Sequence, residues 1–388
     1  MKNIVIAFAF LSCLTTYAQA LYRSFPSDVL GEERNVKILK PRNYNSNQEK
    51  TYPLILVLDG DYLFEPVSGV VDYLSYWDQM PESFVVGINQ RKSRYDDTAI
   101  NVESGFPEEQ AQRYMDFIME LVTTMQKEYR VAPFTVLVAK DINANLASFF
   151  LMRKKVAIDA FLQIEPDYTT LIQENLVNKI SSLDEYNYFY VATSAQKNVA
   201  SELFSEQTDS LFSTKENVKL KHESIEETNF YNVAAQAIPR GLDFIFNEYQ
   251  LVEGEQLLNS NLAQDTSKES ANRTADMKTA VQTLLDKYEY VKKVYGIDMK
   301  LRLKDLVTMS EYIIREKDWE QLLDMATIVD KEYPDIMYGK FIEGMGYEGI
   351  GRYGRAIKSF EQAYILEEAV GLTKDDCLDK VEALQAKE

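Results

Sequence analysis

The chain has 388 residues, of which 46% are hydrophobic, so it can bury a sizeable core and form two domains. Its formal net charge is −19, which argues against nucleic acid and anionic membrane surfaces as partners. A single histidine, His222, serves the whole chain. Because histidine is the usual general base near neutral pH, this scarcity restricts the catalytic mechanisms open to the protein.

Residues 1–20 have the pattern of a secretory signal peptide. Lys2 gives a basic start, residues 4–14 are apolar, and residues 18–20 form a small-x-small cleavage site. The apolar run is too short to span a bilayer, and no later segment resembles a transmembrane helix. We therefore expect an exported protein that is periplasmic or associated with the cell envelope. Lipidation of Cys13 is the alternative, although the residues before it fit that motif poorly.

Residues 21–249 alternate strand-like and helix-like patterns. Continuous apolar or β-branched runs predict strands at 54–58, 84–88, 135–138, 160–164, 186–192 and 218–222. Helical spacing predicts helices at 108–129, 145–152 and 238–249. Strands that alternate with helices indicate an α/β domain with a mostly parallel sheet.

Residues 250–275 are polar and lack periodicity, so they are expected to form a linker. Residues 276–388 are helical in pattern throughout, and small and aromatic residues recur there at the spacing of a tetratricopeptide repeat. One copy consists of Gly344, Tyr347, Gly351, Tyr353, Ala356, Phe360 and Ala363; the positions 34 residues earlier hold Lys317, Trp319, Leu322, Ala326 and Val329. We expect an all-α tetratricopeptide-like domain that offers a protein-contact surface, with a plain helical bundle as the alternative.

Four segments occur in the order seen in one enzyme family. They are residues 52–64, 85–89, 161–166 and 241–246. Together they resemble the second strand, the next strand, the strand after the nucleophile helix and the closing helix of the esterase D-like esterase family. This resemblance covers about residues 25–248 and implies an α/β-hydrolase fold. It also implies a catalytic triad of serine, acid and histidine, and no cofactor.

The position of the expected nucleophile departs from the family pattern. Members of the esterase family that this chain resembles carry Gly-His-Ser-x-Gly-Gly between a strand and a helix. The glycines there permit the sharp turn that exposes the serine oxygen. This chain reads Ala139-Lys140-Asp141-Ile142-Asn143 there. Asparagine tolerates positive φ better than most residues, so the turn can survive. The serine is replaced by Asp141.

The other two triad positions depart as well. The family's general base follows Glu-Thr, but in this chain Glu227-Thr228 is followed by Asn229, which cannot take up a proton near neutral pH. The acid is expected after the strand at 186–192, and Gln196 is the best match for that position. The resemblance therefore predicts degenerate triad positions at Asp141, Gln196 and Asn229.

A relocated mechanism is the runner-up hypothesis. Some α/β-hydrolases use an aspartate on this turn, as haloalkane dehalogenases and epoxide hydrolases do, and Asp141 could then form an ester with the substrate. A histidine is still needed to activate the water that breaks the ester, and His222 is the fallback candidate. This mechanism requires the two side chains to lie within hydrogen-bond reach.

The old substrate cleft offers weaker candidates for ligand binding. Gly60 lies where the resemblance implies a backbone donor of the oxyanion hole, and Asp61 and Asp96 flank the same cleft. No histidine lies near these carboxylates, so no metal site is predicted.

Taken together, these features favour an exported pseudo-esterase that acts as a binding or scaffold protein in the cell envelope. A protein partner is expected at the C-terminal helices. The alternatives are an active ester, carbon–halogen or epoxide hydrolase with relocated residues, and a small-molecule or glycan receptor that uses the old cleft.

Overall fold

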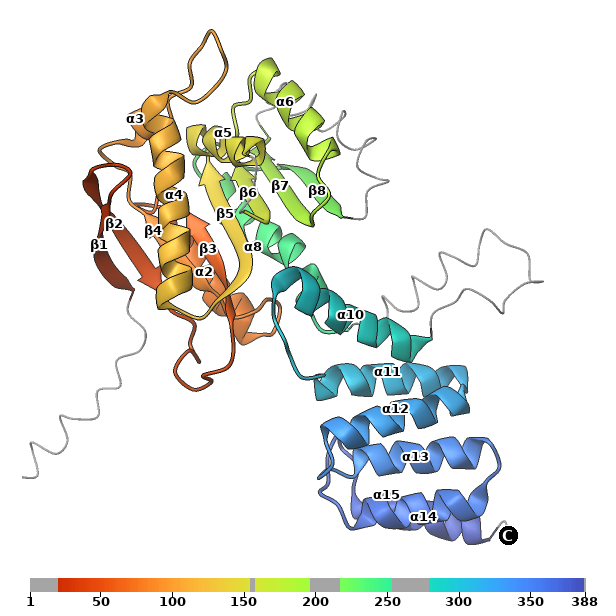
Figure 1. Cartoon of the computed structure of the whole chain (residues 1–388). Helices are drawn as coiled ribbons and strands as arrows, with labels where there is room; N and C mark the ends of the chain where they lie inside the picture. Colours follow the sequence, from red (N-terminus) through yellow and green to blue (C-terminus); the bar gives the residue numbers. More distant parts are fainter. Residues whose placement is uncertain (1–19, 154–157, 196–216, 253–278, 387–388) are drawn as a thin grey trace, which may run out of the picture. The chain divides into compact units, whose positions relative to one another are not determined.

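The computed structural model describes residues 20–153, 158–195, 217–252 and 279–386 (Figure 1). The signal peptide predicted up to residue 20 lies almost wholly outside these residues, as do most of the expected linker and Gln196. The described chain divides into two compact units. The first runs to Tyr249 and also includes Val294–Ile297, and the second contains Gln250–Lys293 and the chain from Asp298 onward.

The first unit is built on an eight-stranded sheet in the order β1-β2-β4-β3-β5-β6-β7-β8. Its strands are β1 (Leu21–Ser27), β2 (Glu32–Leu39), β3 (Tyr52–Val57), β4 (Phe84–Ile88), β5 (Val131–Lys140), β6 (Ala160–Ile164), β7 (Asn187–Ser194) and β8 (Val218–Ile225). The strands from β4 to β8 in this order pair in parallel, whereas β1 and β2 pair in antiparallel fashion at one edge. The predicted α/β fold with a mostly parallel sheet is thus confirmed. The edge strands β1 and β2 were not predicted.

Helices cover both faces of the sheet, which explains why the central strands are apolar on both sides. One face packs against α4 (Glu109–Glu128), α5 (Ile142–Ser148), the 3₁₀ helix η2 (Phe149–Met152) and α6 (Thr170–Ser181). The opposite face packs against α2 (Phe64–Tyr76) and α8 (Val233–Ile245), with the 3₁₀ helix η3 (Asn247–Tyr249) after α8. In Figure 1, α4 crosses in front of the sheet and α8 lies behind it. The short helix α3 (Arg94–Asp97) follows β4.

Gly241 in α8 allows this helix to approach the sheet closely. A Cβ atom there would lie 2.7 Å from side-chain atoms of Leu162 and Tyr190, which belong to the central strands β6 and β7. Real Cβ atoms do not approach other atoms this closely, so the position requires glycine. The close approach allows α8 to cover this face of the sheet over β6 and β7.

Asp159, just before β6, is a largely buried carboxylate that should make stability depend on pH. Burial raises its pKa from 3.8 to about 6, although the Thr135 backbone N–H donates to the carboxylate at 2.7 Å. Below about pH 4 the group is protonated in both the folded and the unfolded chain. Between about pH 4 and 6 the unfolded chain releases the proton first, so stability falls as pH rises.

We expect Asp159→Asn to abolish the loss of stability between about pH 4 and 6, which amounts to at most roughly 3 kcal/mol, because the amide carries no charge. The amide oxygen can still accept the Thr135 N–H. The measurement is urea unfolding of both proteins at about pH 4 and pH 8. The variant should match the wild type at the lower pH and exceed it at the higher one. Asp184→Asn, at an exposed position, is the control. A variant that is less stable than the wild type at pH 8 would contradict the expectation.

A short segment from beyond residue 250 completes the core of the first unit. Tyr295 is fully buried, and its ring lies 4.9 Å from that of Phe134 and 5.5 Å from that of Phe246. Its hydroxyl donates to the Ile245 carbonyl at 2.8 Å. Gly296 follows with a positive φ of 66°, and its carbonyl accepts from the Thr51 hydroxyl at 3.2 Å. The sequence placed Val294–Ile297 in the helical domain, whereas these residues group with the sheet domain.

The second unit is all-helical, as predicted. It contains most of α10 (Ala280–Tyr295), followed by α11 (Leu303–Glu316), α12 (Trp319–Glu332), α13 (Tyr338–Gly349), α14 (Tyr353–Tyr364) and α15 (Lys374–Gln385). Consecutive helices from α11 to α15 pack against one another. Within the described part of the chain, no helix is both long and apolar enough to cross a membrane.

The spacing of 34 residues has a structural counterpart in the second unit. Trp319 and Tyr353 begin α12 and α14, the second helices of two successive hairpins. Lys317, which occupies a usual glycine position, has a left-handed φ of 58°, and Gly351 has a φ of 76° at the equivalent point. Gly344 packs so closely against the Phe360 ring that a Cβ atom would lie 2.6 Å from it. The two hairpins therefore share the geometry of their turns, and a glycine allows the helices of the second hairpin to pack closely.

Candidate functional site

The elbow between β5 and α5 places Asp141 at the carboxyl edge of the sheet. Asp141 has φ 58° and ψ −130°, a backbone conformation that residues other than glycine adopt only under strain. Its N–H donates to the Ile164 carbonyl at 2.9 Å, and its own carbonyl accepts from Ala144 at 2.8 Å. The sharp turn that hydrolases of this fold use to present a nucleophile is therefore present, although the glycines are absent.

Arg94 bridges two carboxylates at this elbow. Its Nε donates to Asp59 Oδ1 at 2.7 Å, and its two terminal nitrogens lie 3.3 and 3.4 Å from Asp141 Oδ2. Asp59 is 2% exposed, and the Arg94 side chain is 19% exposed, so water screens the nearer ion pair only weakly. The guanidinium holds one oxygen of Asp141 and places a positive charge beside its carboxylate. This ion pair opposes attack of that carboxylate on an electrophile.

Neighbouring side chains fix Asp59 in place. Asp59 also has a positive φ, of 55°, and its N–H donates to the side-chain oxygen of Gln90 at 2.9 Å. The Tyr62 hydroxyl donates to Asp59 Oδ2 at 2.9 Å, and burial together with the Asp59 charge raises the pKa of this phenol. Gln90 reaches on to Asn143 at 3.2 Å. The carboxylate at the end of β3 is thus fully occupied by contacts within the protein.

Lys140, one residue before Asp141, packs against an aromatic ring. Its Nζ lies 3.2 Å from the centroid of the Phe230 ring, and the residue is only 5% exposed. Burial lowers the pKa of this ammonium, although the nearby Asp141 and Glu165 carboxylates counteract the effect. Phe230 therefore covers the position where the resembled family carries a histidine.

Asn229 uses its side chain to begin the next helical segment. Its amide oxygen accepts the backbone N–H groups of Tyr231 at 2.9 Å and Asn232 at 3.3 Å. The Asn229 carbonyl also accepts from Val233 at 3.0 Å, at the start of α8. This Asx-type turn directs the side-chain oxygen toward the local backbone. No general base comes from this position.

His222 lies far from Asp141 in the sheet. It occupies the middle of β8 and pairs in register with Val191, which pairs with Gln163, which in turn pairs with Ala139 of β5. Three strand spacings, roughly 14 Å in total, therefore separate His222 from β5, the strand that leads into Asp141. The structure does not bring the aspartate and the histidine together as the relocated mechanism requires.

The remaining sequence candidates take structural roles around the edge. The N–H of Gly60 donates to the Ile88 carbonyl at 2.7 Å, so it is committed to the protein rather than to an oxyanion. Glycine is required there because a Cβ atom would lie 2.6 Å from the backbone of Gly87. Asp61 accepts the backbone N–H of Gln90 at 2.6 Å, and Asp96 is exposed on α3.

The Arg94 bridge has no local sequence signal, because its partners lie 35 and 47 positions away. The strand ends bring them together. Across the described segments, no three histidine, cysteine or acidic side chains converge in a way that could hold a metal ion. The arrangement at the elbow is a network of neutralised charges closed by Phe230, with the acid candidate Gln196 outside the described residues.

The sheet order and the strained turn after β5 define an α/β-hydrolase-like fold. Residues 27–139 match the family described as "Putative esterase". A search of curated proteins gives no match. The family match covers less than half of the chain and ends before Asp141, so it does not include the elbow.

Two solved structures resemble most of the chain. An uncharacterised protein from Capnocytophaga ochracea superposes with a TM-score of 0.78 at 24% identity, covering 95% of this chain and all of that one. An IroE-like serine hydrolase from Shewanella oneidensis superposes with a TM-score of 0.57 at 17% identity, covering 80% and 98%. At these identities the likeness establishes the fold alone.

Proposed function

We propose that this protein is an exported pseudo-esterase that acts as a binding or scaffold protein of the cell envelope. The observation that carries the proposal is the Arg94 bridge, in which one guanidinium holds both Asp59 and the nucleophile-position residue Asp141. The similar structure from Shewanella oneidensis is described as a serine hydrolase, whereas this chain has aspartate rather than serine at its elbow. The position of the base, Asn229, is used to begin α8.

The proposal is tested by turnover of p-nitrophenyl acetate and p-nitrophenyl butyrate. We expect the purified protein to match the buffer blank, and Asp141→Ala and His222→Ala to match it as well. Arg94→Ala is the informative companion because it frees both carboxylates, yet it should gain no activity without a general base. Turnover above the blank that falls in Asp141→Ala or His222→Ala would overturn the proposal.

The second unit supports the scaffold part of this proposal. Its hairpins repeat a left-handed turn at an interval of 34 residues, and Gly344 brings the two helices of the second hairpin close together, as in repeat proteins that bind other proteins. Mild crosslinking of the full chain in its envelope should therefore recover a partner protein joined to helices α11–α15. Crosslinks that fall only on the sheet domain would contradict this assignment.

A further inference from the structure

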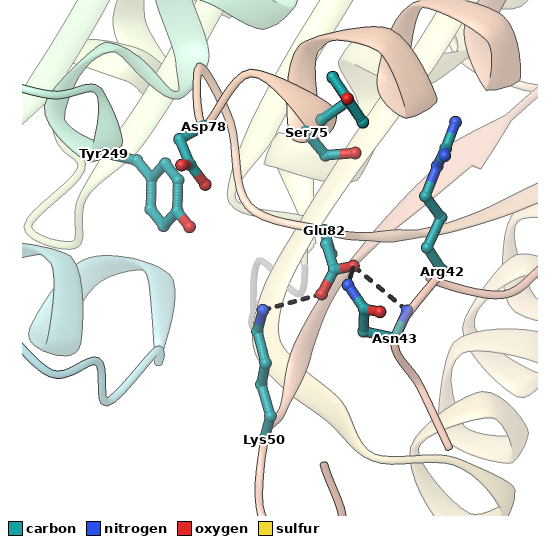
Figure 2. A pocket seen from close by; sticks show the side chains of 8 residues that line it. Arg42, Asn43, Lys50, Ser75, Asp78, Glu82 and Tyr249 are labelled. Atoms are coloured by element: carbon teal, nitrogen blue, oxygen red, sulfur yellow. Dashed lines mark hydrogen bonds and ion pairs between the residues drawn. The ribbon is translucent and has the colours of Figure 1, made fainter. Parts of the chain in front are cut away.

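A pocket opens in the first unit, at the edge of the sheet opposite to the elbow. Its lining residues come from the loop between β2 and β3, from the end of α2 and the loop that leads to β4, and from η3 (Figure 2). The pocket has a volume of about 240 Å³. The lining residues are Arg42, Asn43, Lys50, Ser75, Tyr76, Asp78, Glu82 and Tyr249. The six residues of β3 alone span roughly 20 Å, so this pocket is separate from Asp141.

The two cations of the pocket are already paired within the protein. Arg42 makes two bonds to Asp72, at 2.6 and 2.5 Å, and Lys50 donates to Glu82 at 2.9 Å. Glu82 also accepts both the backbone and the side-chain N–H of Asn43, at 3.2 and 2.8 Å (Figure 2). No cation is left over to attract a phosphate or a carboxylate, and the pocket is therefore poorly suited to an anionic ligand.

The carboxylate of Asp78 is held toward the pocket by an unusual backbone conformation. Asp78 has a φ of 56° at the end of α2, where its N–H bonds to the Ser75 carbonyl and the next N–H bonds to Leu74. Glycine is the usual residue in this helix-ending motif, so an aspartate there carries a cost in stability. Within the described part of the chain, no hydrogen bond or ion pair engages its carboxylate. It is an acceptor available to a ligand.

Aromatic surface borders the same pocket. Tyr76 lines it and is 64% exposed, and Trp77 beside it is 57% exposed, with the two rings 5.1 Å apart at 84°. The Arg42 guanidinium lies 5.6 Å from the Tyr76 ring and steadies it. Rigid aromatic rings of this kind offer apolar contact beside polar groups at a small entropic cost.

We propose that this pocket binds a single neutral sugar ring. A pyranose presents hydroxyl donors to Asp78 and to the hydroxyl oxygen of Ser75, whose own proton goes to the Asp72 carbonyl at 3.2 Å, and it lays its C–H face against Tyr76. The pocket volume lies just below the range of about 300–1,000 Å³ that is typical of sites for larger ligands, which fits one ring. This inference does not depend on the proposed function, because it concerns another edge of the sheet and needs no residue of the elbow.

The experiment uses Trp77 as a reporter. The chain has two tryptophans, so Trp319→Phe in the second unit leaves Trp77 as the only fluorophore of its kind. Glucose, galactose, mannose and N-acetylglucosamine are titrated into this full-length protein. We expect at least one of them to give a saturable change in emission, with a Kd of about 1 mM or tighter.

Asp78→Gly in the same background should weaken that binding about tenfold or more while Tm stays the same or rises, because glycine suits the turn. Asp78→Asn keeps the backbone conformation and should weaken sugar binding as well. Asp96→Asn, at the other edge of the sheet, should bind like the parent. No saturable response to any of the four sugars, or an unchanged Kd in Asp78→Gly, would overturn the proposal. A response to ethanolamine without one to a sugar would overturn it too.

Discussion

Asp97→Ala is expected to destabilise the first unit by about 3–5 kcal/mol, because it leaves a buried arginine without its buried partner. Asp97 is fully buried, and its carboxylate receives Arg34 in a fork, at 2.8 and 2.9 Å. Ser93 also donates to it at 2.7 Å, and Gln110 at 3.2 Å. Urea unfolding followed by Trp77 emission in the Trp319→Phe background measures the loss in this unit.

A second carboxylate on the same arginine provides a matched control. Glu32 lies 2.8 Å from Arg34, but its side chain is 56% exposed. Glu32→Ala should therefore cost no more than about 1 kcal/mol, as exposed ion pairs do. Equal losses in the two variants would show that burial of Asp97 does not determine the strength of the pair. The same network holds α3, and Arg94 is the first residue of that helix.

Tyr295→Ala is expected to destabilise the first unit by about 3–5 kcal/mol, although the residue lies beyond residue 250. The substitution empties a space bordered by the rings of Phe134, Phe246 and Tyr188 and removes the hydrogen bond to Ile245. Urea unfolding followed by Trp77 emission measures this loss of stability.

Tyr295→Phe separates packing from hydrogen bonding at this position. It keeps the ring and loses the bond to the Ile245 carbonyl and the contact with the Tyr188 hydroxyl at 3.3 Å. We expect a loss of about 1–2 kcal/mol, well below that of the alanine variant. If Tyr295→Ala changed only the unfolding of the helical unit, the assignment of this residue to the sheet domain would be wrong.

The central sheet could be predicted because its strands are buried on both faces. Runs such as residues 54–58 and 84–88 are apolar throughout, which few other elements require. The edge strands β1 and β2 could not be predicted, since their burial is partial and polar residues such as Arg34 and Lys37 lie within them. Their stability depends on pairing and on buried ion pairs, which a linear pattern does not display.

The candidate site could be predicted only in part. Local motifs led to the elbow position of Asp141 and to Asn229, and the structure places the first on a strained turn after β5. The Arg94 bridge and the Lys140–Phe230 contact depend on strand ends that meet in space. Local spacing gives no information about such pairs. The sequence also could not show that α2 ends in an aromatic pair beside an unpaired carboxylate.

The burial of Tyr295 has a practical consequence for anyone who wishes to produce the sheet domain alone. A fragment that stops at Tyr249 contains all eight strands of the described sheet, yet it lacks the ring that covers Phe134 and Phe246. Its exposed aromatic surface would favour aggregation. A useful fragment must carry residues 294–297 on a designed connection, because the domain is discontinuous along the chain.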